Sequence, residues 1–237
     1  MKQLSLPPHW NRVLRHAGRA LLPSRCVVCA GAGEAMDLCA PCRAALPWNE
    51  GACRRCGLAF AGEGEDCGAC RLRPPPFTRV QCPLRYAFPV DRLVPRFKFH
   101  GDLAAGEVLA TLMHWGLDPC DRPQALVPVP LHRARLRERG YDQALELARA
   151  LGRLGGPPVR AGALRRLRAT AAQSRLGARA RRGNLRDAFG LRPGHGLPAH
   201  VALVDDVMTT GATLAECAGV LLGAGVRRVD AWCIARA

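Results

Sequence analysis

The chain has 237 residues, which corresponds to one or two domains of ordinary size and excludes a large multidomain machine. Hydrophobic residues make up 49% and charged residues 23% of it, values that exclude an intrinsically disordered or fibrous protein. The formal net charge is +16, and only Lys2 and Lys98 among the 35 basic residues are lysines. Arginine presents a planar fork to phosphate oxygens, so this excess favours polyanionic partners. A GC-rich genome, which raises arginine and alanine together, is the alternative explanation.

The N-terminal segment has no feature of a secreted or membrane-spanning protein. Residues 1–8 lack the apolar stretch of roughly 7 to 15 residues that a signal peptide needs, and no run of about 18 apolar residues is free of charge. We therefore expect a cytoplasmic protein without a membrane span. The apolar spacing from Trp10 to Leu21 predicts an amphipathic helix with a basic opposite face. Such a helix packs on its own domain or lies on a membrane surface, here the inner face of the membrane.

Eight of the twelve cysteines form four C-x-x-C pairs in the first third of the chain. In a C-x-x-C turn two thiolates converge on one ion, and a second pair completes a tetrahedral zinc site with no open position. Four such pairs predict two structural zinc ions. Disulfides are the competing interpretation, but without a secretory signal we expect reduced thiols. The pairs are Cys26/Cys29, Cys39/Cys42, Cys53/Cys56 and Cys67/Cys70.

The order of the pairs along the chain leaves their grouping open. In a sequential arrangement the first two pairs bind one ion and the last two bind the other, whereas a cross-braced arrangement joins the first pair with the third. The remaining cysteines have apolar neighbours and are expected to be small buried residues rather than ligands. They are Cys82, Cys120, Cys217 and Cys233.

The cysteine-rich segment has few large aliphatic residues, so zinc would replace the missing hydrophobic stabilisation. Three consecutive prolines at 74–76 follow it and indicate a stiff connector. We therefore predict three parts: an N-terminal amphipathic helix in residues 1–25, a double zinc ribbon in residues 26–73 and a larger domain in residues 74–237.

The larger domain alternates short apolar runs with helical patterns. Strands are expected at residues 80–88, 126–130, 201–204 and 229–234, and helices at 141–154 and 213–222. Strands separated by helices of this length indicate an α/β fold with a mainly parallel sheet and helices on both faces. In such folds ligands bind at the carboxyl ends of the strands.

The stretch of residues 201–213 is the most informative one. An apolar strand leads to Asp205 and Asp206, and a short hydroxyl-rich loop with Gly211 leads into a helix whose Thr213 and Glu216 have capping-box spacing. Backbone N–H groups at a helix start bind phosphate, and the helix dipole favours its charge. Two carboxylates beside a phosphate would repel it unless they accept hydrogen bonds from sugar hydroxyls, directly or through a divalent ion. A ribose 5-phosphate satisfies both requirements.

These thirteen residues resemble the phosphoribosyl pyrophosphate signature of type I phosphoribosyltransferases, residue by residue. The resemblance implies that Asp205 and Asp206 meet the ribose 2- and 3-hydroxyls with magnesium. It also assigns the 5-phosphate to the loop residues, which are Thr209, Thr210, Gly211, Ala212 and Thr213.

Two further segments are similar to the rest of such a site. Residues 127–133 end a strand in a proline-bounded loop where the family has its pyrophosphate loop, with His132 and Arg133 as candidate contacts. Residues 160–186 carry nine arginines and no acid, which is typical of a flexible lid or of a solvated helix. The candidate lid residues are Arg168, Gln173, Arg182 and Asn184.

The order of all these parts along almost the whole chain resembles the ComF/GntX family. Shared motifs include Phe97-Lys98-Phe99, residues 127–130 and residues 139–143. The resemblance implies a role in natural competence and in the use of external DNA, where a cytoplasmic ComF protein helps single-stranded DNA across the inner membrane. Asp142 stands where many relatives have an amide, which argues against a direct phosphate contact there.

Two functions remain open. The first is transfer of phosphoribosyl to an unknown nucleobase or amine with release of pyrophosphate. The second is a non-catalytic module that binds single-stranded DNA or a phosphorylated nucleotide in the same pocket. The acceptor would bind in a hood segment between Val80 and Cys120, where Lys98 and His100 are candidate contacts.

Overall fold

The computed structural model describes residues 24–34, 36–120, 122–168, 187–194 and 196–237. The chain divides into two compact units, Met1–Ala45 and Leu46–Ala237. The amphipathic helix predicted within residues 10–21 lies outside the described residues. Among those that are described, no helix is long and apolar enough to cross a membrane.

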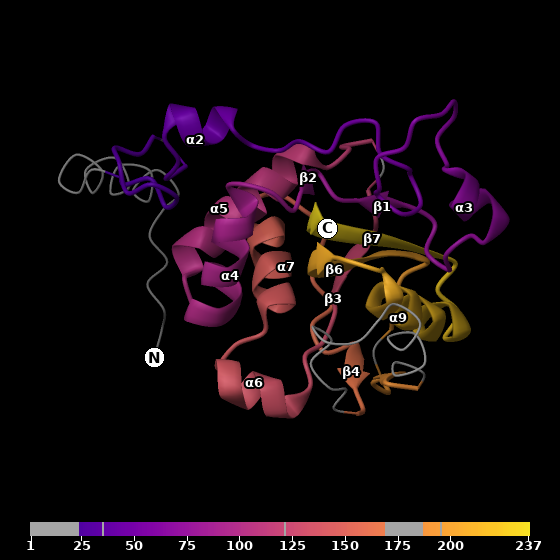
Figure 1. Ribbon diagram of the computed structural model, residues 1–237. Helices are drawn as coiled ribbons and strands as arrows, with labels where there is room; N and C mark the ends of the chain where they lie inside the picture. Colours follow the sequence, from indigo (N-terminus) through magenta and orange to yellow (C-terminus); the bar gives the residue numbers. More distant parts are fainter. Residues whose placement is uncertain (1–23, 35, 121, 169–186, 195) are drawn as a thin grey trace. The chain divides into compact units, whose positions relative to one another are not determined.

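In its described residues the first unit contains the short helix α2 (Ala40–Ala44), with Pro41 in its first turn (Figure 1). Leu38 is fully buried, and a single antiparallel bridge joins Arg25 to Ala32. The part of this unit that the structure describes buries few large apolar side chains, so another source of stability is needed there.

The second unit is built on a sheet in which every strand pair is parallel. The strand order is β1-β7-β6-β3, and β2 also pairs with β7. The two long central strands are almost entirely buried, as expected for a sheet covered on both faces. The strands are β1 (Val80–Gln81), β2 (Leu84–Arg85), β3 (Ala125–Pro128), β6 (His200–Met208) and β7 (Arg228–Arg236).

Helices cover both faces of this sheet (Figure 1). Helices α5 (Leu103–Gly116) and α7 (Gln143–Arg153) pack on one face, and α9 (Ala212–Gly223) packs on the other. The α/β fold with a mainly parallel sheet is therefore confirmed. The other elements are α3 (Gly68–Leu72), α4 (Val90–His100), α6 (Arg133–Arg139) and the antiparallel pair β4 (Leu164–Arg166) and β5 (Phe189–Leu191).

Several expected elements have different limits. The strand predicted over residues 80–88 is divided into β1 and β2 at Cys82-Pro83, where proline lacks the N–H that a ladder needs. The predicted hood is largely helical, formed by α4 and α5. Cys82, Cys217 and Cys233 are buried as predicted, but Cys120 is exposed, so that part of the prediction is wrong.

The last four C-x-x-C cysteines belong to the same compact unit as the sheet. Val80 donates its backbone N–H to the Arg54 carbonyl at 2.7 Å, and the Asn49 side chain donates to the Gly57 and Cys82 carbonyls at 2.9 and 3.0 Å. The domain boundary predicted at residue 74 thus falls inside the second unit and stays a prediction.

Helices α4 and α5 approach each other closely at Gly106. A Cβ at this position would lie 2.6 Å from the Phe97 ring, and Phe97 is 1% exposed, so the ring has no room to move. This contact holds α4 against α5 and thereby positions Lys98, the next residue of α4.

Two helical glycines should therefore respond to alanine with opposite signs. Gly106→Ala should lower the free energy of unfolding by about 1–3 kcal/mol because it overpacks the contact with Phe97. Gly219→Ala should raise it by about 0.5–1 kcal/mol, since a Cβ there meets nothing within 4 Å and alanine favours the helix. Urea unfolding measures both, and equal effects would contradict the packing described here.

Candidate metal centres and phosphate site

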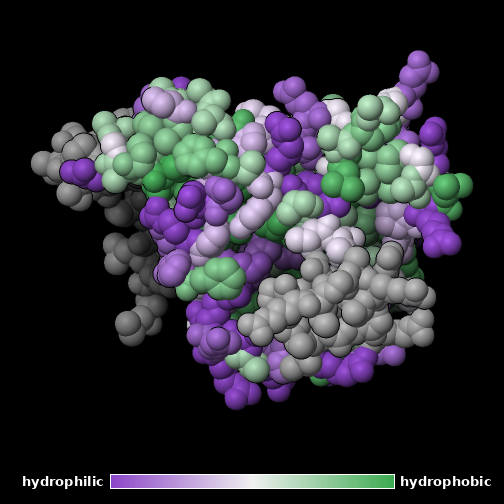
Figure 2. Space-filling model, viewed as in Figure 1, coloured by the Kyte–Doolittle hydropathy of each residue, from purple (hydrophilic) through white to green (hydrophobic). Residues whose placement is uncertain are grey.

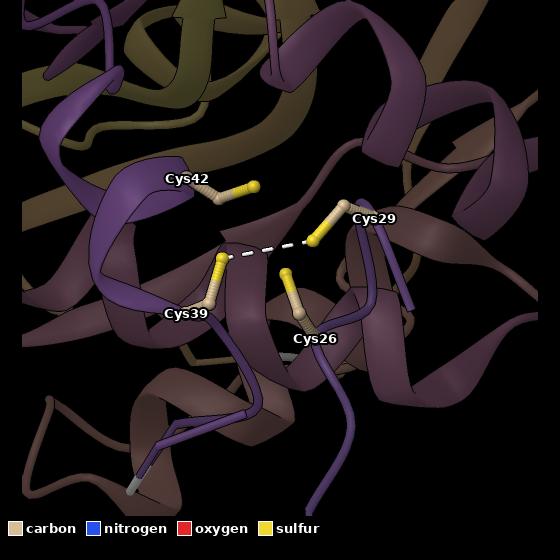
Figure 3. A group of neighbouring side chains, drawn as sticks. All are labelled: Cys26, Cys29, Cys39 and Cys42. Atoms are coloured by element: carbon tan, nitrogen blue, oxygen red, sulfur yellow. Dashed lines mark hydrogen bonds between the residues drawn. The ribbon is translucent and has the colours of Figure 1, made fainter. Parts of the chain in front are cut away.

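The first cluster of cysteines brings four sulfur atoms to one point. Figure 3 shows the Sγ atoms of both pairs directed toward a common centre. Cys39 lies at the start of α2 and Cys42 lies within it, whereas Cys26 and Cys29 come from the preceding turn. These atoms all lie within 4.8 Å of one another, and the Cys29 and Cys39 Sγ atoms are 3.6 Å apart. The cluster consists of Cys26, Cys29, Cys39 and Cys42.

The second cluster repeats this arrangement in the second unit, with its sulfur atoms also within 4.8 Å of one another. The Cys56 and Cys67 Sγ atoms are 3.8 Å apart, and the Cys67 backbone N–H donates to Cys53 Sγ at 3.3 Å. Neighbouring pairs along the chain share one site, so the grouping is sequential rather than cross-braced. The cluster consists of Cys53, Cys56, Cys67 and Cys70.

The pKa values of the thiols in each cluster indicate that the four cysteines need a cation in order to be ionised together. Burial opposes ionisation of Cys26, but backbone N–H groups of Cys29, Cys39 and Val28 outweigh it and lower the pKa of this thiol to about 6. Burial and the neighbouring thiols raise the pKa of Cys42. In the second cluster the pKa of Cys53 is likewise lowered, to about 7, and the pKa of Cys70 is raised. Four thiolates coexist only with a metal between them, and four sulfur ligands suit zinc.

Zinc content tests these two centres. We expect about two zinc ions per chain, and one in Cys70→Ser, since three thiolates leave a tetrahedral site incomplete. Cys120→Ser, which changes an exposed cysteine outside both clusters, is the matched control and should keep both ions. Elemental analysis gives the content. A chain stripped by a chelator that melts at the same temperature as the loaded one would contradict a structural role.

Asp205 and Asp206 lie near the carboxyl end of β6, beyond the part of this strand that pairs with β3. The pairing with β3 ends at Val204, opposite Pro128, so the last residues of β6 have lost one neighbouring strand. Asp206 donates its backbone N–H to Asp205 Oδ1 at 2.9 Å, and Val207 donates to Asp206 Oδ1 at 2.8 Å. These bonds hold both carboxylates in place while leaving oxygen lone pairs for a ligand.

Lys98 compensates the charge of this acidic pair. Its Nζ lies 2.6 Å from Asp206 Oδ2, a nearly buried carboxylate. Burial opposes the charge of Lys98, but Asp206 and Asp205 outweigh it and raise the pKa of the ammonium group. Burial, with the negative charge of Asp206, raises the pKa of Asp205 to about 7. A carboxylate oxygen at this position can accept a hydrogen bond from a hydroxyl group of a ligand.

The loop after β6 has the form expected of a phosphate site. Gly211 has φ of 72° and precedes the first residue of α9, which has no side-chain cap. This positive φ favours glycine, and a Cβ on Gly211 would lie 2.6 Å from Met208 Cε, so a larger residue would displace that side chain. The predicted capping box is wrong, because Glu216 accepts the Asp187 backbone N–H at 2.8 Å instead. The loop surrounds a small hollow of about 30 Å³.

A cavity of about 460 Å³ joins the acidic pair to the loop and to several basic side chains. Among the residues expected in the site, it brings together Asp205, Asp206, Thr209 and Thr213. Sequence reasoning missed three of its arginines. Arg135 and Arg139 are four residues apart on α6, a spacing that places them on one helical face and that could have identified them. Arg166 ends β4 and belongs to the arginine-rich segment of residues 160–186, but nothing in the sequence distinguishes it from the other arginines there. The cations lining the cavity are Lys98, Arg135, Arg139 and Arg166.

His132 and Arg133, the residues expected in the pyrophosphate loop, do not line this first cavity. His132 caps the N-terminus of α6, where its Nδ1 accepts the Ala134 backbone N–H at 3.2 Å. Arg133 lines a second cavity, also about 460 Å³, which shares Pro130, Leu131 and Arg166 with the first. His100 is exposed. Figure 2 shows hydrophilic side chains gathered over α6, in agreement with the basic sequence of this helix.

Asp142 has a local role that explains its departure from the family pattern. It accepts the Leu145 backbone N–H at 3.2 Å as the cap of α7, and its other oxygen accepts the Leu131 N–H at 3.1 Å. The acid therefore ties the loop after β3 to the start of α7. Of the candidate lid residues, Arg168 is exposed just beyond β4, whereas Gln173, Arg182 and Asn184 lie outside the described residues.

Comparison with known proteins agrees with this architecture. Residues 17–71 match the family model of the double zinc ribbon domain. The chain is 37% identical over 209 residues to the DNA utilization protein YhgH of Salmonella typhimurium, covering 84% of this chain and 90% of that protein. It is 33% identical over 226 residues to Competence protein F of Haemophilus influenzae, covering 90% and 97% of the two chains.

The fold and the two clusters define an α/β protein with a double zinc ribbon. With this identity over most of its length, the chain belongs to the ComF/GntX family.

Proposed function

We propose that the chain binds phosphoribosyl pyrophosphate with Mg²⁺ at the carboxyl end of β6 and takes part in DNA uptake or in the use of external DNA. The observation that carries the first part is the acidic pair beside the loop of residues 209–213, inside a cavity otherwise rich in cations. The relatives named for DNA utilization and for competence support the second part.

Each part of the ligand has a chemically matched partner in this proposal. The ribose diol hydrogen-bonds to Asp205 and Asp206. The 5-phosphate binds at the N-terminus of α9, where backbone N–H groups and the hydroxyls of Thr209 and Thr213 face it. The pyrophosphate lies toward Arg135, Arg139 and Arg166, whose guanidinium groups form paired hydrogen bonds with phosphate oxygens.

The acidic pair also fits Mg²⁺, which prefers carboxylate and phosphate oxygens. The Lys98 ammonium group lies 2.6 Å from Asp206. This ion pair supports the view that the two carboxylates are stabilised by cations. Asp205 and Asp206 would hold the ion through the ribose hydroxyls, and the ion would neutralise the leaving pyrophosphate.

The reaction such a site would perform is a displacement at carbon 1 of the ribose. The bond from carbon 1 to the pyrophosphate oxygen breaks, a bond to a nitrogen of a nucleobase or amine forms, and pyrophosphate leaves with the bonding electron pair. The arginines stabilise the departing charge. The chain's part is to orient the ribose and to exclude water, so it needs no nucleophilic side chain.

The DNA-related role places the protein in the cytoplasm, in part at the inner face of the membrane, with single-stranded DNA and the uptake machinery as partners. A second candidate function is a non-catalytic module that binds single-stranded DNA or a nucleotide. The observation that favours it is the second cavity, which adjoins the first and adds four more arginines: Arg133, Arg149, Arg165 and Arg192.

Ligand binding tests the proposed site. Wild-type protein should bind phosphoribosyl pyrophosphate with Mg²⁺ in titration calorimetry, and Asp205→Asn/Asp206→Asn should not. Asp205→Asn alone should bind at least about tenfold more weakly, since it replaces a hydrogen bond to a charged group. This variant should fold, because asparagine keeps the side-chain oxygen that accepts the Asp206 backbone N–H.

Glu107→Gln, which removes an exposed carboxylate on α5, is the control for loss of negative charge and should bind like wild type. Equal affinity in the double variant and in wild type would remove the site assignment.

Two measurements on one preparation separate the candidate functions. Pyrophosphate release is screened against nucleobases and amines, and single-stranded DNA binding is measured at two salt concentrations. A transferase releases pyrophosphate with at least one acceptor, and Asp205→Asn reduces the rate. A DNA-binding module shows no release and an affinity that falls with salt by about 0.7 log units per log unit of salt for each phosphate contacted.

A further inference from the structure

We propose that Arg236 is a positioning residue that couples the second four-cysteine site to the phosphate loop of residues 209–213, so that zinc in this site tightens phosphate binding. The inference rests on the proposed phosphate site and adds a means of control over it. Its basis is a chain of hydrogen bonds between two parts of the molecule that are far apart in sequence.

Arg236 is the last residue of β7 and is only 9% exposed. Its Nε donates to the Cys56 carbonyl at 2.8 Å. Its Nη1 donates to the Met208 carbonyl at 2.9 Å and also to the Ala237 carbonyl. One planar guanidinium group therefore bridges a ligand residue of the metal site and the last residue of β6.

The metal side of this bridge is closely packed. Cys56 precedes Gly57, which has φ of 70° and donates its backbone N–H to the Cys53 carbonyl at 2.8 Å. A Cβ on Gly57 would lie 3.2 Å from Val80 Cγ1 and 3.4 Å from Arg236 Cδ. The turn that presents two thiolates to the ion thus rests directly on β1 and on Arg236.

The phosphate side is equally closely packed. The Met208 carbonyl also accepts the Ala237 backbone N–H at 3.0 Å. The Met208 side chain lies under Gly211, with its Cε 2.6 Å from the position that a Cβ on Gly211 would take. Met208 is 3% exposed. Its position therefore fixes the floor of the loop in which the phosphate would bind.

Electrostatics favour the same arrangement. Zinc with four thiolates carries a net negative charge, which stabilises a buried guanidinium group beside it. Without the ion the turn at Cys56 has no anchor for its thiolates, and Arg236 loses both the charge and a well-placed acceptor. The Met208 carbonyl is then held less firmly, and the loop spends less time in its binding conformation.

The test uses the full chain and phosphoribosyl pyrophosphate with Mg²⁺ as the probe. Arg236→Met should weaken binding about tenfold while elemental analysis still finds two zinc ions per chain. Arg228→Met, at the opposite end of the same strand and bonded to Asp230, is the matched control and should bind like wild type.

Removing each metal site adds a second comparison. Cys53→Ser should lose one zinc ion and weaken binding to the same degree, with no further loss when combined with Arg236→Met, because both changes break one connection. Cys29→Ser, in the separate first unit, should lose one zinc ion without a change in affinity. Additive losses in the combined variant would overturn the proposal.

Hydrogen exchange gives a readout that needs no ligand. The amides of residues 209–213 should exchange faster in zinc-loaded Arg236→Met than in Arg228→Met, and equal rates would overturn the coupling. If wild type does not bind the probe but the exchange rates differ, the proposed function fails and the coupling stands. If wild type binds and both variants match it, only the coupling fails.

Discussion

The candidate site depends on two adjacent carboxylates at the end of a buried strand. Asp205 and Asp206 repel each other and are poorly solvated, which raises the pKa of Asp205 to about 7 and would destabilise the fold without compensation. Lys98 supplies that compensation at 2.6 Å from Asp206, and arginines from α6 and β4 line the same cavity. The cavity therefore places two carboxylates beside several cations, and the proposed ligand site rests on this arrangement.

The parallel sheet brings these groups to one edge. All its strands run in one direction, so the ends of β6 and β7, the loop after β3 and the start of α9 meet at the carboxyl side of the sheet. The second four-cysteine site lies against this side as well, through Gly57 and Arg236. Metal binding therefore stabilises a small ribbon and also supports the region where the ligand would bind.

The two candidate functions use the same chemistry to different extents. Phosphoribosyl transfer needs the acidic pair and the phosphate loop, whereas strand binding depends on the arginines of both cavities. Because the cavities share Arg166, one polyanion could contact both. The names of the relatives, DNA utilization and competence, agree with either use of the site.

Local patterns were enough to identify the α/β class, the four C-x-x-C pairs and the acidic pair with its loop, because each is contiguous in sequence and its chemistry is set by adjacent residues. The sequential grouping of the cysteines and the contacts of Lys98, Arg135 and Arg166 with the site required the tertiary structure. Those residues come from separate elements, and the capping box failed because Glu216 found a distant partner in Asp187. The +16 charge suggested polyanions in general, and only the tertiary structure, which brings α4, α6 and β4 to one cavity, determined which cations surround the carboxylates.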